Sequence, residues 1–215
     1  MKYRWLMLGM AIIGLSGCNT LGHSSERKLA LFRSTVLVEH QGGHVTGFLV
    51  AKDRVLTVSE NVPEDELSIS FFHGETDEGQ VVWRHEKHNL ALVKLEVPSR
   101  YEVPRLSCQS PSPKLYYETI GHPIKARWVL TGGYFHDLES VGDGYRILSF
   151  PLALGMAGAP VFNVWGSPIG IVQALLAEKK EGGGRSNNPK DWGYGLMRQA
   201  SDFCEDLKRA LEDSA

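Results

Sequence analysis

The sequence lacks the features that mark several large protein classes. It contains no long basic run, no internal repeat and no low-complexity tract. The 23 Lys and Arg residues are balanced by 25 Asp and Glu residues, so the formal net charge of -2 argues against nucleic acid as the main partner. The 42% of hydrophobic residues in 215 positions is enough for one large domain or two small ones, and excludes a disordered chain. Scattered Gly and Pro residues indicate many turns between short strands.

The N-terminus also lacks an apolar run long enough to span a bilayer. Trp5–Leu15 is an uncharged apolar run of 11 residues, whereas a membrane span needs about 20. The run follows a short cationic start, Met1–Arg4, and this layout is typical of an export signal. We therefore predict that the first residues are removed on export.

The residues after this run, Leu15-Ser16-Gly17-Cys18, resemble the lipobox of bacterial lipoproteins. The resemblance implies that residues 1–17 are a signal peptide cleaved before Cys18, which then carries acyl chains such as palmitate. A triacylated cysteine anchors a protein stably to a membrane. Asn19 follows in place of Asp, and this implies the outer membrane, facing the periplasm. An ordinary signal peptide with a chance cysteine is the alternative.

Residues 18–30 are then expected to be a membrane tether. Fully extended, the seven residues Asn19–Ser25 reach at most about 23 Å. The folded part should therefore sit close to the bilayer surface.

Short apolar or alternating segments fill the rest of the chain and predict strands. Six of them lie in residues 31–100 and could close one small barrel: Ser34–Glu39, Gly47–Ala51, Arg54–Val58, Leu67–Phe72, Gln80–Arg84 and Leu90–Leu95. Residues 101–114 belong to a Pro-rich linker. Six more lie in residues 115–215 and could form a second barrel: Leu115–Ile120, Arg127–Gly132, Tyr145–Ser149, Ala159–Phe162, Pro168–Leu176 and Gly193–Met197.

The chain ends in a predicted amphipathic helix, Ser201–Leu211. Ser201 is its expected N-cap. Phe203, Leu207 and Leu211 recur at a spacing of four, which places them on one helical face.

Three motifs, in order along the chain, resemble those of the trypsin-like (chymotrypsin-fold) serine peptidases. Thr46–Glu60 is similar to the segment that ends at the catalytic histidine, and Asn89–Leu95 is similar to the strand that begins at the catalytic aspartate. Gly155–Asn163 is similar to the loop of the catalytic serine. The resemblance implies an all-β fold of two six-stranded antiparallel β-barrels with a C-terminal helix.

The three catalytic positions of that family are all substituted here. Glu60 stands at the imidazole position, Asn89 at the carboxylate position and Ala157 at the nucleophile position. Alanine has no nucleophilic atom, and loss of the nucleophile or the base of such a triad lowers kcat by roughly 10⁶-fold. The sequence therefore predicts a pseudopeptidase with no catalytic residue.

Two serines near these positions are candidates for a relocated nucleophile. Ser59 adjoins Glu60, and neighbours along a strand point to opposite faces, so Ser59 should face away from the cleft. Ser149 lies where the family has a strand of the pocket wall. Neither is expected to act.

The backbone of the nucleophile loop could survive as a binding site comprising Gly155, Met156, Ala157 and Gly158. The resemblance implies that the N–H groups of Gly155 and Ala157 point into the cleft as an oxyanion hole, which could hold a carbonyl or a carboxylate. Gly170–Leu176 could accept an extended peptide by β-augmentation. The alternative is that these glycines merely preserve the fold.

Cys108 and Cys204 are implied by the same resemblance to form a disulfide between the linker and the C-terminal helix. The bridge would close a loop of 97 residues in an oxidising periplasm. Two buried thiols are the alternative.

No cofactor or metal site is expected from the sequence. His85 and His88 lack the H-E-x-x-H spacing that places two imidazoles on one helical face, and on a strand their side chains would diverge. We interpret them as parts of a polar turn. His122, in Gly121-His122-Pro123, is interpreted as a turn residue.

The main hypothesis is a membrane-anchored, inactive trypsin-like domain that binds an envelope protein or an extended peptide. An active serine-type peptidase with an unrecognised nucleophile is the alternative. A structural lipoprotein that inherited the fold without a partner is the third.

Overall fold

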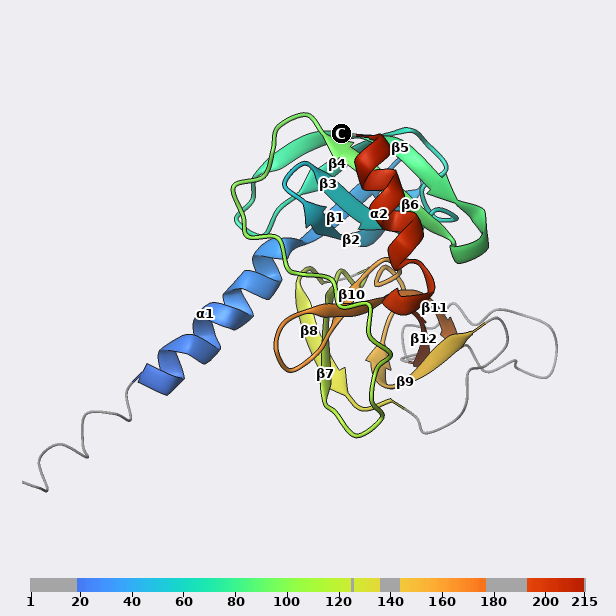
Figure 1. The fold of residues 1–215 in the computed structure, drawn as a ribbon. Coiled ribbons are helices and arrows are strands. Elements are labelled where there is room, and N and C mark those ends of the chain that lie inside the picture. The colour runs from blue at the N-terminus through green and yellow to red at the C-terminus, as the bar shows by residue number, and fades with distance from the viewer. Residues whose placement is uncertain (1–18, 125, 136–143, 177–192, 215) are drawn as a thin grey trace, which may run out of the picture.

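The computed structural model describes residues 19–124, 126–135, 144–176 and 193–214. The predicted signal peptide and Cys18 lie outside these residues. Two sheets form the body of the molecule, and the C-terminal helix α2 (Cys204–Asp213) packs on the first of them (Figure 1).

The first six strands form a closed barrel in the order β1-β2-β3-β6-β5-β4. They are β1 (Thr35–His40), β2 (Gly43–Ala51), β3 (Arg54–Thr57), β4 (Glu66–Ser70), β5 (Thr76–His85) and β6 (Leu90–Leu95). Each overlaps its predicted segment. Fully buried side chains such as Phe48, Leu56 and Leu92 fill the barrel. Alternate residues of a strand share one face, which is why these short apolar segments can close around a core.

The last six strands form a second sheet in the order β8-β7-β10-β11-β12-β9. They are β7 (Tyr117–Gly121), β8 (Val129–Gly133), β9 (Tyr145–Leu152), β10 (Pro160–Phe162), β11 (Pro168–Leu176) and β12 (Gly193–Gln199). A bridge between Phe135 and Leu148 joins the two edges just after β8. The sheet therefore curls into a second barrel, and the predicted all-β fold is confirmed.

The predicted tether is helical rather than extended. Helix α1 (Asn19–Ser34) extends beyond residue 30, and Figure 1 shows it running away from the body. Its final turn is attached to the second barrel, because Leu31 is buried against Ile120 and Phe162. At about 1.5 Å per helical residue, Asn19–Ser25 spans about 10 Å instead of about 23 Å.

The segment forms a helix because of its composition, since Leu, Ala, Glu, Lys and Arg favour helix.

No helix among the described residues is both long and apolar enough to cross a membrane.

The prediction that Ser201 caps the terminal helix is wrong. Ser201 lies in a separate 3₁₀ turn, η3 (Ala200–Asp202), and α2 begins after Phe203 without a side-chain cap. Phe203 is fully buried in the core of the first barrel, which fixes the chain there and delays the start of the helix. The predicted apolar face is otherwise correct, because Leu207 and Leu211 pack on the same core.

A disulfide joins Cys108 in the linker to Cys204 at the start of α2, as the family resemblance implied. It fastens the terminal helix to the segment that connects the two barrels.

Candidate functional site

Glu60 and Asn89, which the family resemblance assigns to the imidazole and carboxylate positions, lie side by side between the barrels. Glu60 follows β3, and Asn89 ends the 3₁₀ turn η2 (Glu86–His88) with a left-handed φ of 51°. The side-chain oxygen of Asn89 accepts a hydrogen bond of 2.7 Å from the backbone N–H of Glu60. Its backbone oxygen accepts a second bond, of 3.3 Å, from Ser59. Asn89 thus fixes the backbone at position 60, whereas the Glu60 side chain is exposed.

The amide group of Asn89 is bonded to a neighbour that the sequence did not reveal. Its Nδ2 donates to Oε1 of Gln173 at 2.9 Å, and Nε2 of Gln173 donates to the backbone oxygen of His88 at 3.2 Å. Gln173 is only 5% exposed and sits at a bulge in β11. Asn89 is therefore part of a neutral chain of amides, which supplies no negative charge to orient an imidazole.

The Asn89–Gln173 pair yields a prediction. In N89D a carboxylate oxygen replaces the donor, 2.9 Å from the carbonyl oxygen of the buried Gln173, so two acceptors face each other in a partly buried site. We expect N89D to lower the free energy of unfolding by about 2 to 3 kcal/mol, measured by urea denaturation.

N163D is the matched control for this prediction. The Asn163 side-chain oxygen accepts from the N–H groups of Trp165 and Ser167, and an aspartate can do the same. A loss in N89D no greater than that in N163D would contradict the prediction.

The loop at the nucleophile position is held by both barrels. The backbone oxygen of Ala157 accepts from Thr46 on β2 at 2.8 Å, and the N–H of Gly158 donates to Val172 on β11 at 2.8 Å. Ala157 packs against the core of the first barrel.

Glycine is required at two positions of this loop. Gly155 and Gly158 have φ of +95° and +85°, and an added Cβ would come within 2.2 Å of the His122 oxygen or 1.9 Å of the Thr46 oxygen. The loop conformation therefore depends on these glycines.

The two N–H groups that the resemblance pointed to are free to donate. Within the described residues, neither Gly155 nor Ala157 has an acceptor for its backbone N–H, whereas Met156 donates to Ala153 and Gly158 to Val172. The loop thus presents two alternate amide donors of the kind that hold an oxyanion or a carboxylate.

Met156 belongs to the predicted binding loop through its backbone alone. Its side chain is fully buried in the core of the second barrel, and an added Cβ on Gly121 would lie 2.9 Å from its Cγ. The turn directs the side chains of Met156 and Ala157 into different cores.

Neither candidate serine has an imidazole partner among the described residues. The Ser59 hydroxyl accepts from Arg84 at 3.3 Å. Ser149, exposed on β9, donates to the Tyr134 oxygen.

His122 is a buried turn residue at the junction of the barrels. Its Nδ1 accepts from the N–H of Trp128 at 3.2 Å, and its backbone oxygen accepts from Nε2 of His44 at 2.8 Å. Burial lowers the pKa of His122 to about 3, with further lowering by His44 and Arg127. The ring is therefore neutral at neutral pH and serves to pack the junction.

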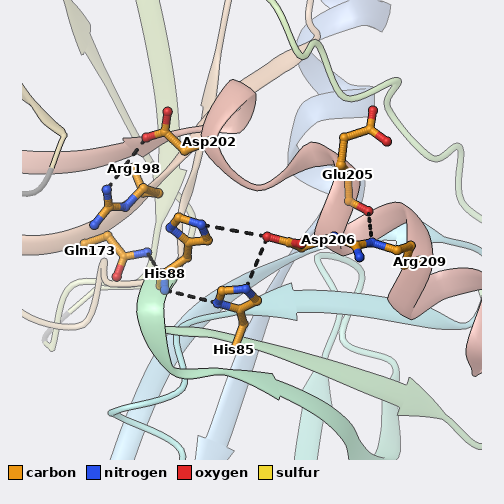
Figure 2. A network of polar contacts seen from close by, with 8 residues as sticks. All are labelled: His85, His88, Gln173, Arg198, Asp202, Glu205, Asp206 and Arg209. Atoms are coloured by element: carbon orange, nitrogen blue, oxygen red, sulfur yellow. Dashed lines mark hydrogen bonds and ion pairs between the residues drawn. The ribbon is translucent and has the colours of Figure 1, made fainter.

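His85 and His88 lie at a polar turn, as predicted, and their rings converge there, whereas on a continuous strand they would diverge. They are three residues apart across the 3₁₀ turn η2, where such residues eclipse, and their rings stack with centroids 4.6 Å apart. Figure 2 shows both rings facing Asp206 of α2. Burial, followed by the charge of His85, lowers the pKa of His88.

Comparison with known proteins agrees with this geometry. A family model described as the trypsin-like peptidase domain matches residues 45–171. No curated protein matches the sequence.

Solved structures share the fold at low sequence identity. Protease Rv3671c from M. tuberculosis H37Rv in an inactive form aligns with a TM-score of 0.69 and 15% identity over 87% of this chain and 93% of its own. An inactive serine-to-alanine mutant of Rv3671c aligns with a TM-score of 0.68 and 16% identity over 86% of this chain and 89% of its own. A serine endoprotease from Yersinia pestis aligns with a TM-score of 0.70 and 16% identity over 87% of this chain and 67% of its own. Together with a family model that covers more than half of the residues, this places the chain in the trypsin-like peptidase family.

Proposed function

We propose that this chain is a catalytically inactive trypsin-like domain, anchored to the membrane through Cys18, that binds an extended peptide segment of an envelope protein. The peptide would lie in the former active-site cleft.

The observation that carries the loss of activity is the bonding of Asn89. Its amide is bonded to Gln173 and to the backbone N–H of Glu60. Ala157, which lacks a nucleophilic atom, packs against the core of the first barrel. Three separate changes thus remove the base, its orienting charge and the nucleophile.

Two features of the backbone support peptide binding at the cleft. The N–H groups of Gly155 and Ala157 have no acceptor among the described residues. One edge of β11 pairs with β12. After Val172, its other edge pairs with none of the described strands. An extended peptide could add there by main-chain hydrogen bonds.

Two exposed apolar side chains also border the loop. Leu154 is 59% and Ile124 62% exposed, and their backbones are hydrogen-bonded at 3.1 Å. They could contact apolar side chains of a bound peptide.

The membrane anchor is supported by the lipobox resemblance around Cys18. Helix α1 would connect this cysteine to the second barrel through Leu31. Asn19 in place of Asp after this cysteine supports a position at the periplasmic face of the outer membrane.

In-cell photocrosslinking from Leu154 tests the proposal. A photoreactive residue there lies at the edge of the cleft without disturbing the core. We expect one dominant peptide-containing adduct, identified by mass spectrometry. Trp165, which is 70% exposed on the β10–β11 turn, is the control position and should not give this adduct.

The variant G155A tests whether the adduct depends on the loop Gly155–Gly158. Because Gly155 cannot accept a Cβ without displacing the His122 oxygen, G155A should abolish the adduct from Leu154 while circular dichroism shows a folded chain. Equal adducts from Leu154 and Trp165, or none from Leu154, would contradict the proposal.

A further inference from the structure

Three potential metal ligands converge where α2 meets the first barrel. His85 ends β5, His88 lies in η2, and Asp206 lies in the first turn of α2 (Figure 2). Oδ2 of Asp206 is 3.2 Å from Nε2 of His85 and 3.9 Å from Nε2 of His88. All three donor atoms lie within 4.8 Å of one another.

We propose that His85, His88 and Asp206 bind a divalent transition-metal ion of the zinc class. Zn–N and Zn–O bonds of about 2.0 to 2.2 Å place tetrahedral ligands about 3.3 Å apart. The 3.2 Å separation between Asp206 and His85 is already close to this value, whereas the 3.9 Å separation between Asp206 and His88 has to shorten on binding. Two imidazoles and one carboxylate are ligands that zinc prefers, and the fourth position remains for water.

The surrounding charges orient the carboxylate. Oδ1 of Asp206 pairs with Arg209 at 2.5 Å, so Oδ2 is left to face the two imidazoles. The nearby cation Arg198 is paired with Asp202 at 3.7 Å and lies over the ring of Tyr145.

Metal binding has to displace two contacts of the His85 ring. Nδ1 of His85 accepts from the N–H of His88 at 3.2 Å, which leaves the ring proton on Nε2, 3.2 Å from Oδ2 of Asp206. When Nε2 binds the metal, that proton moves to Nδ1, so the bond to His88 and the direct contact with Asp206 are both lost. Metal–ligand bonds replace the two contacts, and the ring keeps its proton.

The ion would tie the terminal helix to the corner that carries Asn89. His88 immediately precedes Asn89, and its backbone oxygen accepts from Gln173. The site is independent of peptide binding at the cleft, so either proposal can fail without the other.

Zinc binding by the full-length chain tests the site. The chelator-treated protein is dialysed against micromolar Zn²⁺, and bound metal is measured by mass spectrometry alongside the thermal unfolding midpoint. We expect a single Zn²⁺ per chain and a higher midpoint. D206N and H88Q should each weaken binding by at least about 100-fold, since even loss of an outer-shell partner weakens metal sites by 10- to 100-fold.

E205Q is the matched control, because it removes the same charge from the neighbouring position of α2 and its side chain lies outside the cluster. It should bind Zn²⁺ as the unmodified chain does. H85Q replaces either variant if that variant fails to fold. The proposal is overturned if the folded chain retains no Zn²⁺, or if D206N, H88Q and E205Q bind it equally, which would mean adventitious binding elsewhere.

Discussion

The purified chain is expected to remain unlabelled by a fluorophosphonate probe and to leave protein substrates uncleaved. Such probes react with a serine hydroxyl activated by a neighbouring base. Ala157 provides no hydroxyl, and neither Ser59 nor Ser149 has an imidazole partner among the described residues. Loss of the nucleophile or base lowers kcat by roughly 10⁶-fold in a serine peptidase, so turnover should be below detection.

A157S makes this prediction more stringent. It restores the hydroxyl but leaves Glu60 and the neutral Asn89–Gln173 pair in place, so it should also stay unlabelled. An active trypsin-like peptidase serves as the positive control. Labelling of the unmodified chain at any serine would establish the alternative, an active peptidase with an unrecognised nucleophile.

Removal of the Cys108–Cys204 disulfide should produce the largest loss of stability. The two cysteines are 96 positions apart, and the loop-entropy model assigns about 4 to 5 kcal/mol to closing a loop of this size. Domains are typically stable by only about 5 to 15 kcal/mol. The variant C108A/C204A should therefore unfold at a much lower urea concentration.

The reducing agent dithiothreitol distinguishes the disulfide from side-chain packing. It should destabilise the unmodified chain to a similar extent but leave C108A/C204A unchanged. A loss below about 1 kcal/mol in both measurements would mean that the bridge contributes little beyond the packing of Phe203 and Leu207.

The sequence alone determined the architecture, and it led to the prediction that the catalytic positions are substituted. Alternating β-branched and apolar segments predict strands because a strand buries every second residue. All twelve predicted segments overlap strands of the structure. Glu60, Asn89 and Ala157 were identified because their motifs are contiguous and occur in the family's order.

Helix boundaries were less predictable. Ser201 has the chemistry of an N-cap, but burial of Phe203 in the barrel core delays the helix to Cys204. The tether carried no apolar pattern that revealed α1. In both cases packing or propensity over a whole segment outweighed a single local signal.

Only the tertiary structure decided how distant side chains combine. Gln173 is 84 residues from Asn89, and Asp206 is more than 100 residues from His85 and His88, so no spacing rule connects them. Met156 adjoins Ala157 yet points into the opposite core. Local patterns fix which face of a strand is buried, but contacts between barrels depend on the packing of the whole chain, and the composition of the cleft follows from that packing.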